Sequence, residues 1–295
     1  MLCSKRFQGS DMGTISESIK SGKCCSCGIC VGVCPRNAIT LILKKGIPTP
    51  RIDSKLCVGC SICRDVCPGI SGVEFSGNCE QTGFEKQVLG CCLTAYNAFA
   101  KDSKMLQMAT SGAVVTTLIK KLIPTEYQHA FVINTNCYIN IVKTTSYKSS
   151  EGMYNIAKSR YVSASQEEAI RYMLAHKQEK LIFVGTSCAI RGIESVIKKF
   201  RLTREQYLLI GLFCDKTMNY NVWKYFSKLE KENGKLLQLY FRDKEVNGYP
   251  GGVKLEYDNQ TRLLSKERRS EVKDFFCHPY CLYCIDKLYS SFYIF

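Results

Sequence analysis

Residues 24–35 read Cys-Cys-Ser-Cys-Gly-Ile-Cys-Val-Gly-Val-Cys-Pro, and residues 57–68 read Cys-Val-Gly-Cys-Ser-Ile-Cys-Arg-Asp-Val-Cys-Pro. Both runs follow the spacing C-x2-C-x2-C-x3-C-P, so all four cysteines of one run have counterparts in the other. A doubled run of this kind predicts an internal two-fold repeat at the start of the chain. The residue type that it repeats, a thiol, is a ligand for soft metals.

This spacing is typical of bacterial ferredoxins with two 4Fe–4S clusters, where the fourth cysteine of each run ligates the other cluster. We therefore expect two crossed ligand sets. The first is Cys24, Cys27, Cys30 and Cys67, and the second is Cys57, Cys60, Cys63 and Cys34. Zinc knuckles and a disulfide scaffold are the alternatives. Zinc sites typically use two C-x-x-C pairs with a longer spacer, so they leave the third cysteine and the C-P ending unexplained.

The composition is that of a soluble globular protein. The chain has 295 residues, 45% of them hydrophobic and 23% charged, and no apolar run reaches the ~18 residues of a membrane-spanning helix. The first twenty residues are polar and lack a signal core, so we expect a cytoplasmic protein. In that reducing compartment the 19 cysteines indicate metal binding rather than disulfides. The net charge of +15 is spread along the chain without interleaved aromatics, which argues against nucleic-acid binding.

Four segments follow from these patterns. Residues 1–18 form an extension, residues 19–78 an α+β ferredoxin-like two-cluster domain, residues 79–103 a linker, and residues 104–295 an α/β domain. Apolar strands at 38–41 and 73–75 follow the two cysteine runs. In the second domain, strands are predicted at 130–133, 180–184 and 207–213, and helices at 165–175, 189–200 and 219–231. The last helix carries Val222, Phe226 and Leu229 on its apolar face.

The strand–helix–strand pattern places two further cysteines together. Strands joined by a helical crossover are parallel, so their carboxyl ends meet at one edge of the sheet. Cys188 follows one strand, after the predicted turn 185–188, and Cys214 follows the next. Ligands of open α/β sheets bind at this edge, although both residues could instead be small buried side chains. The three histidines lack an evident acid/base partner, so a hydrolytic triad is not indicated.

Six motifs, in this order, carry a family resemblance: Thr110-Ser-Gly-Ala113, Ser159-Arg-Tyr-Val162, Phe183-Val-Gly-Thr-Ser-Cys-Ala-Ile190, Gly211-Leu-Phe-Cys214, Tyr240-Phe-Arg-Asp-Lys244 and Cys281-Leu-Tyr-Cys284. With them the chain resembles, from about Leu89 to Cys284, the beta subunits of coenzyme F-420 hydrogenase and dehydrogenase. That family includes flavin-dependent reductases preceded by a two-cluster ferredoxin. Ser187, Ala189 and the pair Asp215-Lys216 depart from the family pattern, and relatives usually continue beyond Cys284. A shortened member with weakened catalysis is therefore one expectation.

The resemblance implies a flavin-binding α/β domain with a partly parallel sheet, and a third cluster in some members. We expect FAD to contact Thr110, Ser111, Gly112, Arg160, Gly185, Thr186 and Lys244. Simple capping of the following helix is the alternative for Thr110, Ser111 and Gly112. We expect the third 4Fe–4S site to use Cys188, Cys214, Cys281 and Cys284, with Cys277 as the substitute ligand and zinc as the alternative metal. No catalytic residue is assigned.

The expected function is that of an iron–sulfur flavoprotein oxidoreductase of anaerobic type. Clusters pass single electrons, whereas a flavin can exchange a hydride with a deazaflavin or an organic substrate. The alternative is a non-enzymatic, ferredoxin-type electron-transfer subunit of a larger redox complex. A third alternative is an inactive scaffold. The expected partner is a redox protein or a small redox coenzyme, and assembly into an oligomer is compatible with this interpretation.

Overall fold

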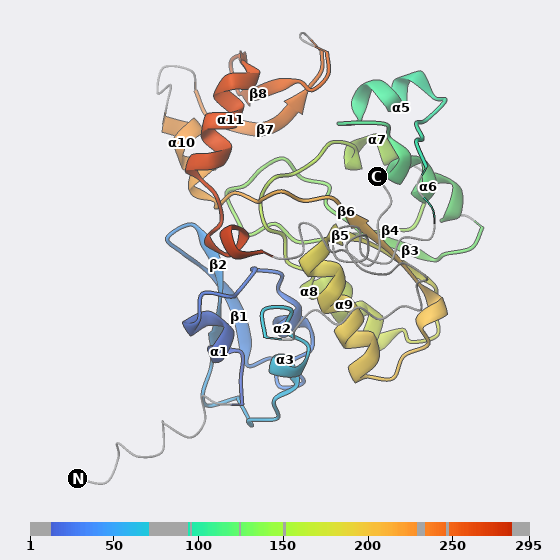
Figure 1. The fold of residues 1–295 in the computed structure, drawn as a ribbon, viewed down its shortest axis with the longest axis vertical. Helices are drawn as coiled ribbons and strands as arrows, with labels where there is room; N and C mark the ends of the chain where they lie inside the picture. The colour runs from blue at the N-terminus through green and yellow to red at the C-terminus, as the bar shows by residue number, and fades with distance from the viewer. Residues whose placement is uncertain are drawn as a thin grey trace, which may run out of the picture.

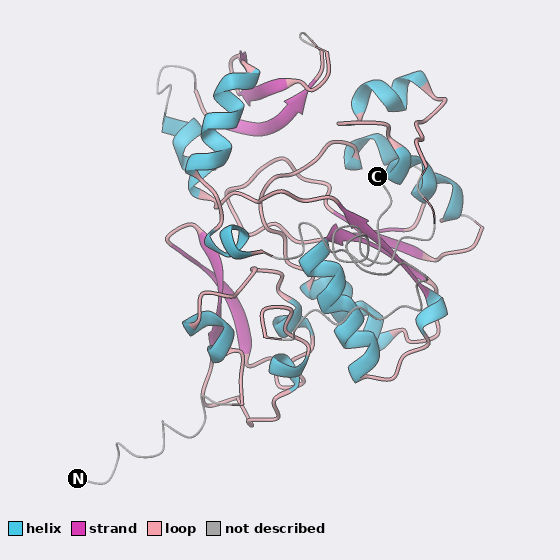
Figure 2. Ribbon diagram, in the orientation of Figure 1, coloured by secondary structure: helices cyan, strands magenta, loops and turns pink. Residues whose placement is uncertain are grey.

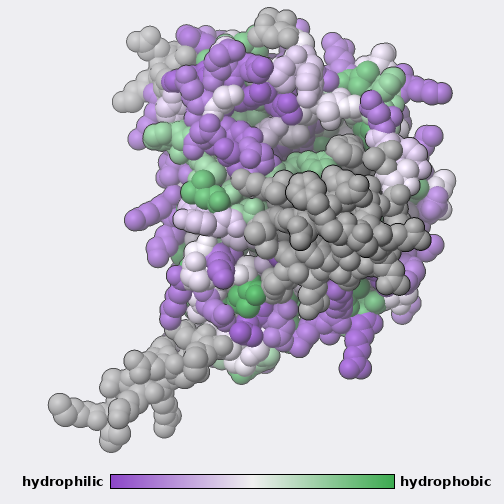
Figure 3. Space-filling view, in the orientation of Figure 1, coloured by the Kyte–Doolittle hydropathy of each residue, from purple (hydrophilic) through white to green (hydrophobic). Residues whose placement is uncertain are grey.

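The computed structural model describes residues 13–70, 94, 96–123, 125–149, 152–228, 234–245 and 248–284. This part of the chain comprises an N-terminal module (residues 13–70), a central four-stranded sheet flanked by helices, and a C-terminal three-stranded sheet (Figures 1 and 2). Hydrophilic residues cover most of the described surface visible in Figure 3. Among the helices described, none combines the length and the apolar character needed to cross a membrane.

The N-terminal module repeats its local backbone at the two cysteine runs. It contains α1 (Ser16–Lys20), α2 (Ile29–Gly32), α3 (Ile62–Asp65) and the antiparallel pair β1 (Ile39–Lys44) and β2 (Ile47–Ile52). Gly28 and Ser61, each one residue after the second cysteine of its run, are both left-handed, with φ of 69° and 62°. Ser26 and Gly59, each two residues after the first cysteine of its run, are left-handed too, with φ of 60° and 67°.

Strand β2 is absent from the sequence-based prediction. Pro48 and Pro50 lie within it, and proline is normally confined to strand edges because it has no N–H to donate. Among the described residues, β2 pairs with β1 alone, so within that part of the chain its prolines lie on an edge. The predicted strand at 73–75 lies outside the described residues.

Glycines allow the N-terminal module to pack closely against α8 (Glu167–Ala175) and α9 (Ser187–Lys199). A Cβ atom added to Gly28 would lie 2.0 Å from Ser165 Oγ, and one added to Gly32 would lie 2.7 Å from Ile170 Cβ. A Cβ atom on Gly192 of α9 would lie 2.3 Å from Ile29 Cδ1. The module and the two helices therefore share one apolar core.

The central sheet has the order β4 (Thr145–Tyr147), β3 (His129–Val132), β5 (Leu181–Thr186), β6 (Tyr207–Leu212). Strands β3, β5 and β6 are parallel, which confirms the predicted partly parallel sheet, and β4 is antiparallel to β3. The predicted turn at 185–188 was wrong. Gly185 and Thr186 continue β5, paired with Gly211 and Leu212 of β6, and α9 begins directly at Ser187.

Alternate residues of the central strands face two different cores. Phe131 and Phe183 pack with α8 and α9, whereas Ile182 and Ile210 pack on the opposite side. The opposite side carries α5 (Ser103–Met108), α6 (Val114–Leu122) and α7 (Met153–Ile156) (Figure 1). This period of two is what a sheet covered on both faces requires.

The C-terminal sheet was not predicted from the sequence. It comprises β7 (Leu236–Asp243), β8 (Gly252–Tyr257) and β9 (Thr261–Leu264), all antiparallel, with α10 (Asn221–Lys228) and α11 (Lys266–Phe275) packed beside it. Val222 and Phe226 of α10 are fully buried in its core, as predicted, while Leu229 lies outside the described residues. Met218 forms single β-bridges with Val162 and with Cys277, which joins this unit to the central one.

Substitution of Gly28 tests whether close packing holds the module in place. Gly28 and Gly22 both have φ of +69°, but a Cβ atom on Gly22 would meet nothing within 4 Å. Both alanine variants incur the same left-handed strain, and only Gly28→Ala also collides with Ser165. We expect Gly28→Ala to lose about 2 kcal/mol more unfolding free energy than Gly22→Ala, measured by anaerobic urea denaturation. Equal losses would contradict the packing argument.

Candidate functional site

The first thiol group comprises Cys24, Cys27, Cys30 and Cys67. The pKa of Cys24 is raised to about 11, chiefly by burial, and the nearby Cys67 and Cys188 contribute in the same direction. Burial followed by the charges of Cys24 and Cys67 raises the pKa of Cys30 well above its ordinary value. Like charges disfavour ionisation only at close range, so these shifts reflect thiols gathered in one place. The structure brings the crossing cysteine, Cys67, to the first run.

The second thiol group comprises Cys34, Cys57, Cys60 and Cys63, which line a single hollow together with Arg36 and Ile39. Burial raises the pKa of Cys63, and the charges of Cys60, Cys34 and Cys57 act in the same direction. The Ala38 N–H donates to the Cys34 sulfur over 3.3 Å. Cys60 is exposed, whereas Cys30 and Cys67 of the first group are buried. The second group is thus the one nearest to solvent.

The third thiol group comprises Cys188, Cys214, Cys281 and Cys284. Cys188 is the second residue of α9, Cys214 follows β6, and the last two lie in and directly after the 3-10 turn η3 (Pro279–Tyr283). Burial raises the pKa of Cys214, and Cys188, Cys281 and Cys284 raise it further, so all four lie close together. The Thr217 N–H donates to the Cys281 sulfur over 3.4 Å. The role of Cys277 as a substitute ligand stays a prediction.

Cys25 connects the first group with the third, although the sequence motifs gave this residue no role. Its thiol shares hydrogen bonds with Cys188 and with Cys27. The bond with Cys188 lowers the pKa of Cys25, but the bond with Cys27 and burial outweigh it. The only sequence signal was its place beside Cys24. Of the other cysteines without an assigned role, Cys137 is described, whereas Cys3, Cys79, Cys91 and Cys92 lie outside the described residues.

The thiol groups have the chemistry of cluster ligands. All cysteines in the described ranges are free thiols, so no disulfide competes for them there. Within the same ranges, no three Cys, His, Asp or Glu side chains are placed to hold a single metal ion. A cubane cluster binds four thiolates, each through a different iron. Each of the three groups supplies that number of thiols.

His278 ties the late cysteine segment to the N-terminal module. Its Nδ1 accepts from the Tyr280 N–H over 3.2 Å, so the Nε2–H donates to Ser26 Oγ, 2.9 Å away. The Ser26 hydroxyl in turn donates to the Pro48 carbonyl over 2.6 Å. The imidazole is buried, and burial lowers its pKa to about 4. A neutral histidine therefore holds Cys281 and Cys284 against the loop that carries Cys25 and Cys27.

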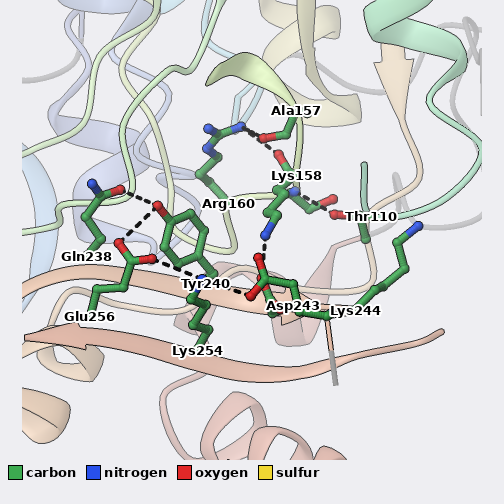
Figure 4. A network of polar contacts seen from close by, with 12 residues as sticks. Thr110, Ala157, Lys158, Arg160, Gln238, Tyr240, Asp243, Lys244, Lys254 and Glu256 are labelled. Carbon is green, nitrogen blue, oxygen red and sulfur yellow. Dashed lines mark hydrogen bonds and ion pairs between the residues drawn. The ribbon is translucent and has the colours of Figure 1, made fainter. Parts of the chain in front are cut away.

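The proposed flavin residues fall into two separate places. Figure 4 shows Thr110, Arg160 and Lys244 around the ion pair of Lys158 with the buried Asp243. The Thr110 hydroxyl accepts from the Ser159 N–H over 2.8 Å, and Lys244 donates to the Leu106 carbonyl over 2.9 Å. Gly185 and Thr186 lie instead beside the third thiol group, where Thr186 Oγ1 is 3.3 Å from the Cys188 sulfur.

Arg160 serves the backbone of its own loop. Its guanidinium donates to the carbonyls of Ile156, Ala157 and Lys158 over 2.6–2.8 Å, and Nε donates to the Thr135 carbonyl over 3.3 Å. Burial lowers its pKa. As placed, Arg160 orders residues 156–160 and contributes positive charge to the network.

The start of α6 lacks a side-chain cap within the described part of the chain, and the residue before it, Ala113, is left-handed with φ of 59°. The Thr110 hydroxyl is used by Ser159 and Ser111 is exposed, so the simple capping alternative is wrong. Gly112 lies so close to the preceding segment that a Cβ atom would be 2.8 Å from the Ala98 carbonyl. Uncapped amides at a helix start beside a hydroxyl and cations fit a phosphate group.

His129 has partners that sequence reasoning missed. It contacts Ser146 through Nδ1, and Nε2 lies 2.8 Å from the Tyr172 hydroxyl and 3.6 Å from the Glu179 carboxylate. These residues are remote in sequence, so no local motif announces them. Because His129 is buried and burial lowers its pKa, it is a neutral link that holds β4 and α8 to β3.

Comparisons with known proteins match two segments of the chain. Residues 23–69 match the family model of the 4Fe-4S dicluster domain, and residues 178–291 match that of the C terminus of the coenzyme F420 hydrogenase/dehydrogenase beta subunit. A similar solved chain comes from the xenon-derivatised F420-reducing NiFe hydrogenase complex of Methanosarcina barkeri. The identity is 12% and the TM-score 0.43, over 64% of this chain and 66% of that one. No curated protein matches the chain.

These matches confirm the resemblance inferred from the sequence. The chain carries an N-terminal iron–sulfur dicluster domain, followed by a segment similar to part of an oxidoreductase complex. The motifs at 110–113 and 159–162 lie outside both matched segments.

Acidification tests the His278 link. The folded-state pKa of about 4 lies below the ordinary value of 6.5, so the unfolded chain takes up the proton first as the pH falls. Stability from this site is therefore complete above pH 6.5 and is lost as the pH falls towards 4, by up to about 1.4 kcal/mol per pH unit. We expect His278→Gln to remove part of the stability difference between pH 7.5 and 5.5 seen in urea denaturation. His176→Gln, at an exposed site, is the matched control and should leave the difference unchanged.

The crossed arrangement of the first two thiol groups predicts that the fourth cysteine of each run is needed for the cluster of the other run. Cys34→Ala should abolish the cluster of the second run, and Cys67→Ala that of the first run. Each variant should lose about four irons and one of the two corresponding paramagnetic resonance signals. An intact pair of signals in Cys34→Ala, or loss of the same signal in both variants, would contradict the crossing.

Proposed function

We propose that this chain is an iron–sulfur flavoprotein subunit that passes electrons between clusters and a flavin. The first and second thiol groups hold one 4Fe–4S cluster each, and the third group holds another. FAD, when bound, supplies hydride chemistry to a deazaflavin or an organic substrate. The protein works in the cytoplasm with a redox protein or a small redox coenzyme as partner.

The serial order of the thiol groups carries this proposal. Cys63 of the second group acts on the pKa of Cys30 in the first, and Cys188 of the third acts on Cys24. The groups therefore run from the exposed second, through the buried first, to the third at the sheet edge. Electrons are carried by iron–sulfur centres, whereas zinc has no redox activity, so a series of this kind favours iron at all three.

The residues around Asp243 and at the start of α6 would hold the flavin. The amides before Val114 and the Ser111 hydroxyl would take phosphate, and Lys244, whose pKa is lowered by burial and by nearby Lys158 and Arg242, would add charge. Gly185 and Thr186, at the carboxyl end of β5, would face the cofactor from the side of the third thiol group. The chain's own part is to orient the cofactor and to exclude water around it.

A second candidate function is that of an electron-transfer subunit without a flavin. The observation that favours it is the use of Arg160, whose Nε and Nη1 donate to four backbone carbonyls. In that case hydride chemistry resides in a partner, and the chain supplies only the series of clusters.

Anaerobic purification with iron, sulfide, zinc and flavin measured on one sample separates these functions. About twelve irons and one FAD per chain support the proposal. About twelve irons without FAD, and no FAD uptake, select the electron-transfer subunit. About eight irons and one zinc would refute a redox role for the third thiol group.

The third site predicts a selective loss. We expect Cys188→Ala to reduce the iron content from about twelve to about eight per chain, while the signals of the other two clusters remain. Cys137→Ala is the matched control, because Cys137 belongs to the core of the C-terminal sheet and not to a thiol group. Unchanged iron in Cys188→Ala would remove this residue from the ligand set.

A further inference from the structure

A cationic hollow lies between β7 and α11, apart from every residue discussed as a cluster or flavin ligand. It encloses about 150 Å³ and is lined by Tyr161, Met218, Phe241, Arg242, Arg269, Ser270 and Lys273. Three of these side chains are positively charged and none is acidic. The hollow shares no residue with those labelled in Figure 4.

The two arginines are held side by side by the backbone. Arg242 Nε donates to the Pro250 carbonyl over 3.2 Å, and Arg269 donates to the same carbonyl over 3.1 Å and to that of Gly251 over 3.0 Å. Arg242 also donates to the Tyr161 hydroxyl over 3.3 Å. Each guanidinium has five N–H donors, so both keep donors for a ligand.

The nearby acid Glu267 acts on Arg269, but its effect on the pKa of Arg269 is smaller than that of Arg242. Neither Arg242 nor Arg269 forms an ion pair in the described part of the chain, whereas the neighbouring Arg268 pairs with Glu271 at 2.9 Å. The pKa of Arg269 is lowered by burial and then by the charge of Arg242. Lys273 is paired with Asp215 at 2.8 Å but adds further positive potential. Two cations held side by side without an ion-paired acid are unfavourable alone and favourable around an anion.

We propose that this hollow binds an oxyanion group, phosphate or carboxylate, of a small molecule. Paired arginine forks match the planar or tetrahedral oxygens of such groups. The volume suits one such group rather than a whole dinucleotide, since pockets for complete ligands typically measure ~300–1,000 Å³. The rest of the molecule would extend past the exposed Tyr249, whose ring lies 5.5 Å from the Arg242 guanidinium.

The location connects the hollow to the third thiol group. Lys273 lines the hollow, and its charge lowers the pKa of Cys214. Met218, another lining residue, bridges to Cys277 shortly before the late cysteines. A bound anion would therefore be adjacent to the third group. The inference that the anion belongs to a redox reactant rests on the proposed function. The inference that the hollow binds an anion does not.

Calorimetric titration of the full chain with inorganic pyrophosphate tests the site. We expect saturable binding by the native chain, weakened about tenfold or more in Arg269→Met and in Arg242→Met. Arg268→Met, one position along the same helix and outside the hollow, is the matched control and should bind like the native chain. Iron content and melting temperature establish that each variant folds. Arg269→Lys, which keeps the charge but loses the fork, should bind with intermediate affinity.

Titrations with citrate and with FAD identify the source of the anion. Competition of pyrophosphate with FAD, with both weakened by Arg269→Met, assigns the hollow to the phosphates of the flavin. Independent binding of the two assigns it to a second molecule, and tighter binding of citrate than of pyrophosphate marks that molecule as a carboxylate. Absence of saturable binding, or equal binding by all variants, overturns the proposal. Because pyrophosphate binding requires neither iron nor flavin, such a result leaves the proposed function to its own test.

Discussion

The close contact of α2 with α8 and α9 is the constraint on which the arrangement of thiols depends. Gly28, Gly32 and Gly192 remove the side chains that would keep these helices apart. The same contact brings the first cysteine run to the amino end of α9, where Cys188 lies. A looser interface would leave the N-terminal module a separate domain and would separate the first thiol group from the third. The shared core therefore brings the first and third thiol groups together as well as stabilising the fold.

Because the thiols are buried, we expect them to ionise only as the clusters are inserted. Desolvation and mutual repulsion raise the thiol pKa values of Cys24, Cys30 and Cys214. Iron binds thiolates, so cluster insertion must release protons against these shifts, and iron supplies the positive charge that compensates them. The N-terminal module thus gains its full stability only in the loaded state.

The sequence predicted those parts of the structure that are encoded by residue spacing or by the period of apolar residues. The doubled cysteine run and the parallel strands around Phe183 and Leu209 follow directly from spacing and apolar period. Sequence reasoning missed β2 because of its prolines and β9 because its residues are mostly exposed, but it overlooked the alternation of buried and less buried residues in β7 and β8. The site residues that were missed, such as Cys25, His278 and Arg269, depend on partners far along the chain. No short-range pattern encodes such contacts.

The hydrogen bond of His278 with Ser26 has a consequence for biosynthesis. Its two partners are separated by 252 positions, so a ribosome releases the first cysteine run long before the segment that covers it exists. During that interval the nascent N-terminal module presents an open face on the side of Cys25 and Cys27. The cysteines of the first two groups, all within residues 24–67, are therefore complete in the polypeptide well before Cys281 and Cys284 of the third group are made.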